Sequence, residues 1–230
     1  MTSRTYKILL LVVFAVFWGW SAWNPLYPHD WLLENYLVFI AIPLILVTGY
    51  WFKLSNVSYT LITLFMILHV VGAHYTYSEV PFGYKLQEWL GADRNMYDRL
   101  VHFSYGFLLA YPVREIFVRL AHAKGIWTYF FPVDITLAAS AIYEIIEWRT
   151  AANVDMSAGL AFLGSQGDIW DAQKDMMLAG LGALITMLIV FAINAYFKKG
   201  FWREMWESIK PSKHDAPLGE VKLGEYIDRR

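Results

Sequence analysis

The chain has 230 residues, of which 57% are hydrophobic, 18% aromatic and only 17% charged, and its formal net charge is −1. Soluble domains carry about 25% charged residues, so this composition excludes a disordered chain and a basic domain that binds nucleic acid. The chain contains no cysteine, which also excludes disulfide scaffolds, thiol nucleophiles and thiolate metal sites.

Six apolar runs follow one another along the chain, at residues 8–23, 31–50, 57–73, 97–120, 132–148 and 176–197. Most are close to the roughly 20 residues that a helix needs to cross a bilayer. The 11 tryptophans lie mostly at the ends of these runs, as in the aromatic belts of membrane proteins. The pattern predicts an all-α polytopic integral membrane protein, a helical bundle of about six transmembrane helices. The fourth and fifth runs carry charged residues and are therefore the less apolar ones.

The distribution of Lys and Arg predicts that both termini are cytoplasmic. With the N-terminus inside, the inner segments hold 14 basic residues and the outer segments hold 5, in agreement with the positive-inside rule. The near-zero net charge then divides into −7 outside and +6 inside. An acidic outer side attracts cations and disfavours a strongly anionic substrate.

We predict two regions, a six-span transmembrane domain over residues 1–197 and a cytoplasmic tail over residues 198–230. The tail begins with a stripe of apolar side chains at helical spacing, formed by Phe201, Trp202, Met205, Trp206 and Ile209. Basic residues accompany this stripe, which suits a short amphipathic helix in the inner headgroup layer. A partner-binding motif is the alternative reading.

Ionisable residues near the outer ends of four runs are the main functional signal, because such groups are costly inside a membrane. The third run contributes His69 and, just beyond its end, His74, which starts an aromatic polar segment with Tyr75 and Tyr77. The two histidines are five residues apart, so they diverge by about 140° on an ideal helix.

The fourth run contributes Asp98 and His102, whose i,i+4 spacing places them on one helix face. They suit either two metal ligands or a carboxylate that fixes the histidine tautomer. Arg99 adjoins them and is predicted to hold an anionic head group.

Five acids complete this polar layer at a similar depth. Glu144 and Glu147 are three apart on the fifth run, and Asp168, Asp171 and Asp175 share one face if the sixth helix starts near Asp168. A structural reading is the alternative, with Asp98 and Asp168 as helix caps and hydrogen bonds that hold the bundle together. Asp134 is expected to cap the start of the fifth run.

Two carboxylates and two imidazoles suit a divalent metal with open positions, zinc above all, which can activate water. The predicted ligands are His69, His74, Asp98, His102 and Asp175. Glu144, Glu147 and Asp171 are the predicted catalytic residues, and Arg99, Tyr75 and Tyr77 the predicted substrate-binding ones. Acid–base chemistry without a metal and proton relay in a transporter use the same groups.

Four segments together resemble the YjdF-like inner-membrane proteins of bacteria: HVVGAHYTY (69–77), NMYDRLVHF (95–103), YEIIEW (143–148) and GDIWDAQKDM (167–176). The resemblance covers roughly residues 5–200 and implies an inner-membrane location, without an established activity. A looser resemblance to VanZ-like proteins rests on Asp98, His102 and Phe103, on Glu144, and on Asp171 or Asp175 before a Gly-rich span. It implies a role linked to envelope lipids or the cell wall.

From residues and resemblance together, we predict an inner-membrane protein with an outward-facing His/Asp/Glu site. Its concrete form is a metal-assisted hydrolase or transferase that acts on an amphiphile of the cell envelope. The alternatives are a proton- or cation-coupled transporter or ion-binding protein, and a non-catalytic assembly factor of the envelope. The expected partners are the lipid bilayer and that amphiphile, and nucleic acid is not among them.

Overall fold

The computed structural model describes residues 2–153, 164–211 and 224–228, and the regular structure in these ranges is helical. Six helices are long: α1 (Ser3–Ala22), α2 (Pro28–Trp51), α3 (Asn56–Tyr75), α5 (Tyr97–Arg119), α6 (Trp127–Ala151) and α8 (Asp171–Phe197). Three labelled helices are short, namely η1 (Tyr77–Glu79), α4 (Pro81–Leu90) and α9 (Phe201–Ser208), and residues 224–228 are also helical.

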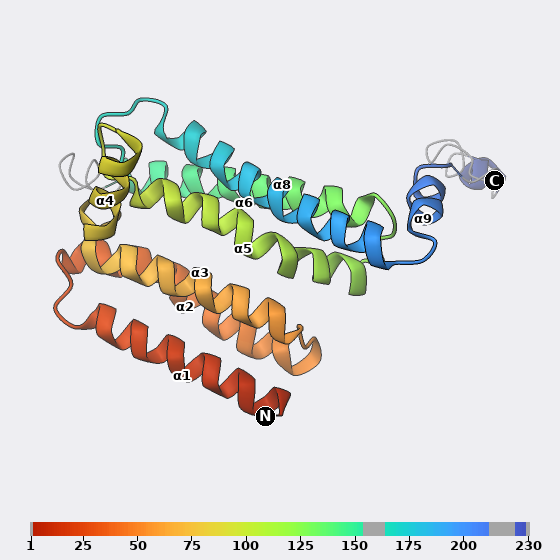
Figure 1. Ribbon diagram of the computed structural model, residues 1–230, viewed down its shortest axis with the longest axis horizontal. Helices are drawn as coiled ribbons and strands as arrows, with labels where there is room; N and C mark the ends of the chain where they lie inside the picture. Colours follow the sequence, from red (N-terminus) through yellow and green to blue (C-terminus); the bar gives the residue numbers. More distant parts are fainter. Residues whose placement is uncertain (1, 154–163, 212–223, 229–230) are drawn as a thin grey trace.

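The long helices form two groups of three that lie side by side (Figure 1). In the first group, α3 packs against α1 and α2; in the second, α5 packs extensively against α8 and also against α6. The contact between α3 and α5 joins the two groups. α1 starts and α8 ends at the same end of the bundle, near α9, whereas α4 lies at the opposite end (Figure 1). We refer to these as the α9 end and the α4 end.

Each of the six predicted apolar runs is a helix in the structure. The largest differences are at the starts of α1, α6 and α8, which lie five residues before the runs, at Ser3, Trp127 and Asp171. α1 and α8 begin with mainly polar residues that a count of apolar residues leaves out, whereas α6 begins with aromatic residues before Pro132. α6 also passes through Pro132, so the prediction that Asp134 caps this helix is wrong.

Five of the long helices are long and apolar enough to cross a membrane, and α5 is not one of them. α5 has 23 residues and carries Asp98 and Arg99 in its first turn and Arg119 in its last. Because it packs against α3, α6 and α8, it exposes less of its surface than an outer helix and does not need a wholly apolar composition. The all-α polytopic architecture is confirmed, and a sixth span at α5 stays a prediction.

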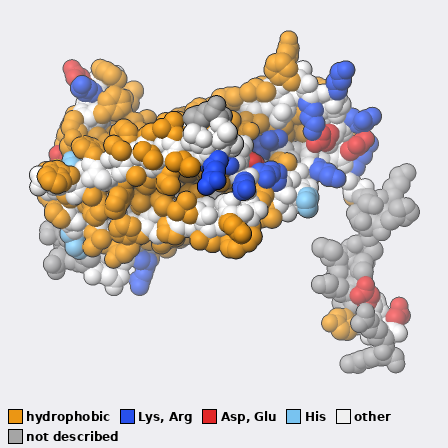
Figure 2. Space-filling view, turned by 90° about the horizontal axis from the view of Figure 1, so that it is seen from below, with side chains coloured by type: hydrophobic (Ala, Val, Ile, Leu, Met, Phe, Trp, Pro, Cys, Tyr) orange, Lys and Arg blue, Asp and Glu red, His pale blue; other side chains and the backbone are white. Residues whose placement is uncertain are grey.

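The outer surface of the bundle is largely apolar, and its interior holds polar side chains beside an apolar core. Figure 2 shows hydrophobic side chains over most of one face, with Lys and Arg gathered toward the α9 end. Trp23 and Tyr50 are 80% and 79% exposed. The interior holds polar side chains that are at most 2% exposed, namely Ser21, Asn35, Ser58, His69, Asn95, Thr136, Ser140 and Asp175.

Close packing of α5 on α8 depends on glycine. A Cβ atom on Gly106 would lie 1.8 Å from the carbonyl oxygen of Ala179, and one on Gly182 would lie 2.2 Å from that of Phe103. Small residues let membrane helices approach each other in this way. This interface fixes the position of the acidic start of α8 relative to α5.

We expect Gly106→Ala to lower the free energy of unfolding by about 1–3 kcal/mol, because the added methyl group meets backbone that cannot move aside. Thermal unfolding of the purified protein in detergent, followed by circular dichroism, measures the effect. Gly19→Ala on α1 is the matched control, since a Cβ there meets nothing within 4 Å. Equal melting temperatures for the two variants would contradict the prediction.

Candidate functional site

Three side chains from two helices form a compact cluster, which we call the Asp–His–Asp cluster: Asp98 and His102 on α5 and Asp175 on α8. One carboxylate oxygen or ring nitrogen of each residue lies within 4.8 Å of those of the other two. His102 Nε2 is 3.5 Å from Asp98 Oδ1, so the predicted shared face of Asp98 and His102 is present. This spacing of one imidazole and two carboxylates is compatible with a common metal ion.

Glu144 on α6 lies beside the cluster, with its Oε1 atom 3.7 Å from His102 Nε2. In the part of the chain that the structure describes, Glu144 Oε1 and Asp175 Oδ1 are buried and have no hydrogen-bond partner. The Asp175 side chain is 3% exposed. An unpaired buried carboxylate oxygen is costly, so these atoms indicate a missing partner, either a proton or a cation.

Arg99 holds the acidic start of α8. Its Nη2 atom lies 3.1 Å from Asp168 Oδ2 and 2.6 Å from Asp171 Oδ1, and its Nη1 atom pairs with Asp175. The three acids that we predicted to share a face thus converge on one guanidinium group. Arg99 is 7% exposed in its side chain and is not among the residues that line the cavity described below. Its place suits an internal counter-ion better than the predicted binding of a head group.

Arg94 adds a second positive charge from the segment before α5. It pairs with Asp171 and lies 3.5 Å from Asp98 Oδ2. Asp171, which we predicted to be catalytic, therefore accepts hydrogen bonds from both arginines. This arrangement gives Asp171 a positioning role and leaves Asp98, His102 and Glu144 as the candidate reactive groups.

Asp168 lies outside the membrane-spanning segments, just before α8. The Lys174 ammonium group lies 2.7 Å from Asp168 Oδ2, and the Trp170 N–H donates to Oδ1. The hydrogen bond from Lys174, followed by that from Trp170, lowers the pKa of Asp168 to about 2. Asp168 is therefore ionised at neutral pH and remains a partner for Arg99.

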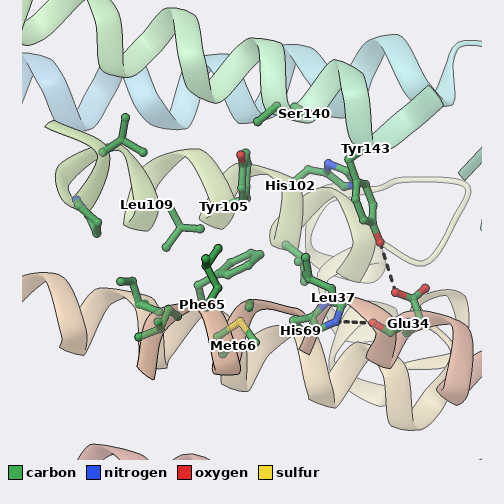
Figure 3. A pocket seen from close by; sticks show the side chains of 18 of the residues that line it. Glu34, Leu37, Phe65, Met66, His69, His102, Tyr105, Leu109, Ser140 and Tyr143 are labelled. Atoms are coloured by element: carbon green, nitrogen blue, oxygen red, sulfur yellow. Dashed lines mark hydrogen bonds between the residues drawn. The ribbon is translucent and has the colours of Figure 1, made fainter. Parts of the chain in front are cut away.

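A cavity of 610 Å³ extends from the Asp–His–Asp cluster along the bundle, between α2 and α3 on one side and α5 and α6 on the other. One end is polar and is lined by Glu34, His69, Tyr77, Asp98, His102, Tyr143 and Glu147. The remainder is mainly apolar, with Ile45, Phe65, Met66, Leu109 and Ile116 among its lining residues. Figure 3 shows this division, with Glu34, His69, His102 and Tyr143 together and Phe65, Met66 and Leu109 farther along.

His69 and Tyr77 line the cavity, but both ring nitrogens of His69 already have partners. Nε2 lies 3.0 Å from the carbonyl oxygen of Glu34, and because a carbonyl only accepts, Nε2 carries the hydrogen. Nδ1 then accepts from the Tyr77 hydroxyl at 2.5 Å. The predicted ligand His69 thus supports the cavity wall as a neutral imidazole in this arrangement.

The structure places His74 and Tyr75 away from the cluster, between α3 and α1. The His74 ring lies 4.4 Å from the Trp20 ring, and its Nδ1 atom donates to the carbonyl oxygen of Ser21 at 3.0 Å. Tyr75 packs against Trp20 and His74. The predicted roles of His74 as a ligand and Tyr75 as a substrate contact therefore have no support from the geometry.

Glu34 is the main residue that our sequence analysis did not assign to the site. It is 6% exposed and accepts a hydrogen bond from the Tyr143 hydroxyl at 3.4 Å, drawn in Figure 3. The signal was present, because Glu34 is an acid within an apolar run, which is a functional-site candidate by default. Arg94 was missed because it lies outside the apolar runs, although it is four residues before Asp98.

Comparison with known proteins places the chain in a family. A family model described as a predicted membrane protein, DUF2238, matches residues 6–196. The chain belongs to the DUF2238 family. It is also 43% identical over 196 residues to the inner membrane protein YjdF of Escherichia coli (strain K12), an alignment that covers 82% of this chain and 92% of that protein. No solved structure matches the chain.

The matches confirm the predicted YjdF-like relationship and, together with the helices of membrane-spanning length, a membrane protein. The resemblance to VanZ-like proteins stays an expectation, because neither match concerns them. The structure adds that three of the four segments that carried the YjdF-like resemblance meet at Arg99 and His102. The segment over residues 69–77 instead contributes His69 and Tyr77 to the cavity.

Proposed function

We propose that this member of the DUF2238 family is a metal-assisted hydrolase or transferase that acts on an amphiphile of the cell envelope. The observation that carries the proposal is the position of the Asp–His–Asp cluster at the polar end of a mainly apolar cavity. Asp98 and His102 belong to both the cluster and the cavity wall. A group bound in the cavity would therefore meet the reactive side chains directly.

In this proposal, Asp98, His102 and Asp175 hold a divalent ion, with zinc as the leading candidate. The unpartnered buried Oδ1 of Asp175 supports it, since Asp175 has one oxygen on Arg99 and a second that is free to bind. Glu144, which lies 3.7 Å from His102, is suitably placed as a further ligand or as a base. Glu147 lines the cavity and would contact the substrate head group.

The reaction would follow the chemistry of metal-activated water. A divalent ion held by the cluster would polarise a bound water, and Glu144 would be placed to accept the proton of that water. The water oxygen would then bond to the electrophilic carbon or phosphorus atom of the substrate, the bond from that atom to the leaving oxygen would break with its electron pair, and Glu144 would return the proton to the leaving oxygen. In a transferase, an acceptor hydroxyl replaces the water.

The proton- or cation-relay alternative has less support from the geometry. A relay requires polar groups from one side of the membrane to the other. The ionisable side chains that line the cavity lie at its polar end, apart from Tyr59 and Tyr105, and its other half is mainly apolar in the part of the chain that the structure describes. This one-sided arrangement favours a site that serves one membrane face.

Our placement of the site on the outer side, with both termini cytoplasmic, rests on the positive-inside rule. The structure is compatible with it, since α1 starts and α8 ends at one end and the cluster lies toward the other. At the α9 end, Trp202 and Trp206 are 66% and 60% exposed, which suits α9 as an interfacial helix. Of the predicted tail, residues 212–223 and 229–230 lie outside the described residues.

Element analysis of the purified protein tests the proposal. We expect about one zinc or other divalent ion per chain after equilibration with zinc, and a loss of at least roughly tenfold in affinity for Asp175→Asn. Glu88→Gln on α4 is a matched acid-to-amide control, because Glu88 is exposed. A folded wild-type protein that binds no divalent ion would overturn the metal-assisted mechanism.

A further inference from the structure

The cavity extends far beyond the polar end that would hold a substrate head group. Along α2 it is lined from Glu34 to Thr48 and on to Phe52, and along α5 from Asp98 to Leu120. At 1.5 Å per residue, the stretch from Glu34 to Phe52 spans about 27 Å. The hydrocarbon core of a bilayer is about 30 Å thick, so one leaflet contributes roughly 15 Å. The cavity therefore extends through nearly both leaflets.

The two walls of the cavity have little backbone contact with each other. Among the described residues, α2 packs against α3 but has few backbone contacts with α5 or α6, which form the other wall. At the polar end, the Tyr143–Glu34 hydrogen bond joins α6 to α2, so a chain entering from the membrane between these helices would pass beyond that bond. The cavity volume of 610 Å³ lies within the range of ligand pockets, about 300–1,000 Å³.

We propose that the cavity binds a lipid with a hydrocarbon chain longer than one leaflet, of the polyprenyl type, with its polar head at Glu34, His102 and Glu147. An ordinary acyl chain of one leaflet would leave the half around Thr48 and Phe52 unfilled. A polyprenyl chain reaches this half and buries apolar surface there, which favours binding by about 25 cal/mol per Å² of buried surface. The part of a long chain that exceeds the cavity remains in the surrounding lipid or detergent. This inference rests on the proposed function only in the reaction assigned to the head group. Binding of the chain is independent of that function, because the half of the cavity around Thr48 and Phe52 has no part in metal binding.

Uncharged isoprenyl alcohols of different length provide the probes, since they avoid repulsion between a phosphate and the acids of the polar end. Purified protein is exposed to farnesol, geranylgeraniol or undecaprenol in detergent with a chelator present, and native mass spectrometry measures the fraction of protein that retains each alcohol. We expect undecaprenol to be retained at least about tenfold more than farnesol. Equal retention of the three alcohols, or none, would overturn the proposal.

Tryptophan substitutions at two adjacent residues on α2 distinguish binding in the cavity from simple partitioning into detergent. Both residues are exposed, but Thr48 lines the cavity, whereas Val47 is not among the lining residues. Thr48 lies about 21 Å along the helix from Glu34, beyond the reach of a chain of one leaflet. Thr48→Trp should reduce undecaprenol retention to the level of farnesol and leave farnesol unchanged, while Val47→Trp should affect neither.

A second pair of variants on α2 tests the same point if Thr48→Trp fails to fold. Ile45 lines the cavity, and its neighbour Leu46 is 56% exposed and does not. Ile45→Trp should lower undecaprenol retention relative to Leu46→Trp. Equal effects within both pairs would overturn the proposal. Selective chain binding by a protein that holds no metal would leave this inference standing and remove the metal-assisted function, and zinc binding without chain selectivity would do the reverse.

Discussion

Replacing Arg99 by methionine should destabilise the protein by about 3–5 kcal/mol, the range observed when one partner of a buried ion pair is removed. Arg99 contacts Asp168, Asp171 and Asp175, so the substitution leaves these carboxylates near one another with only Arg94 and Lys174 to compensate. Methionine keeps an unbranched side chain of similar length, so the loss of charge rather than of volume is tested. The melting temperature in detergent measures the effect.

Two further variants make the Arg99 test specific. Arg203→Met is the control, since the Arg203 side chain is 80% exposed and lies 3.8 Å from Glu207, where an ion pair contributes little. Adding Asp171→Asn to Arg99→Met should restore part of the lost stability, because it removes one of the uncompensated charges. A melting temperature for Arg99→Met equal to that of Arg203→Met would contradict the role of Arg99 as an internal counter-ion.

Substitution of His102 by glutamine should abolish stoichiometric zinc binding, with a loss in affinity of at least roughly tenfold to a hundredfold. His102 is the single imidazole of the Asp–His–Asp cluster, and glutamine removes its coordinating nitrogen while it keeps a polar side chain. Isothermal titration with zinc and element analysis after dialysis measure the loss. The same experiment on Asp98→Asn and Asp175→Asn should give losses of similar size.

His74→Gln is the matched control for this experiment. The sequence suggested both histidines as ligands, but the structure places His74 against Trp20 and the carbonyl oxygen of Ser21. We therefore expect His74→Gln to retain zinc at the wild-type level. Retention of zinc by His102→Gln, or equal loss in both variants, would show that the cluster is not the metal site.

Much of the architecture was predictable because hydrophobicity is a local property of the chain. Each long helix corresponds to an apolar run, and helix ends deviated mainly where polar residues continue the helix, as in α8, which starts at Asp171. α5 was harder to classify because a helix that packs against three others tolerates charges. Its Arg99 is matched by acids at the start of α8, which are distant in sequence, whereas Asp98 is matched by Arg94, four residues earlier.

The candidate site was predictable in part, and the reason is helical geometry. The i,i+4 spacing of Asp98 and His102 fixes their common face, and the structure shows them 3.5 Å apart. No such spacing relates Glu34 to Tyr143, which are 109 residues apart in sequence and meet only because α2 and α6 flank the cavity. His69 and His74 are only five residues apart on α3, yet they face different neighbours because the helix turns by about 140° between them.

The sequence by itself determined the class of this protein, its family and the depth of its polar layer. These properties follow from the free energy of placing each residue type in lipid, which can be summed along each run without knowledge of the other helices. The tertiary structure alone decided which polar groups meet. It placed Arg99 among three carboxylates, separated His74 from the cluster, and added Glu34 to the cavity. Such pairings depend on the rotation and packing of helices, which the apolar pattern of a single run does not encode.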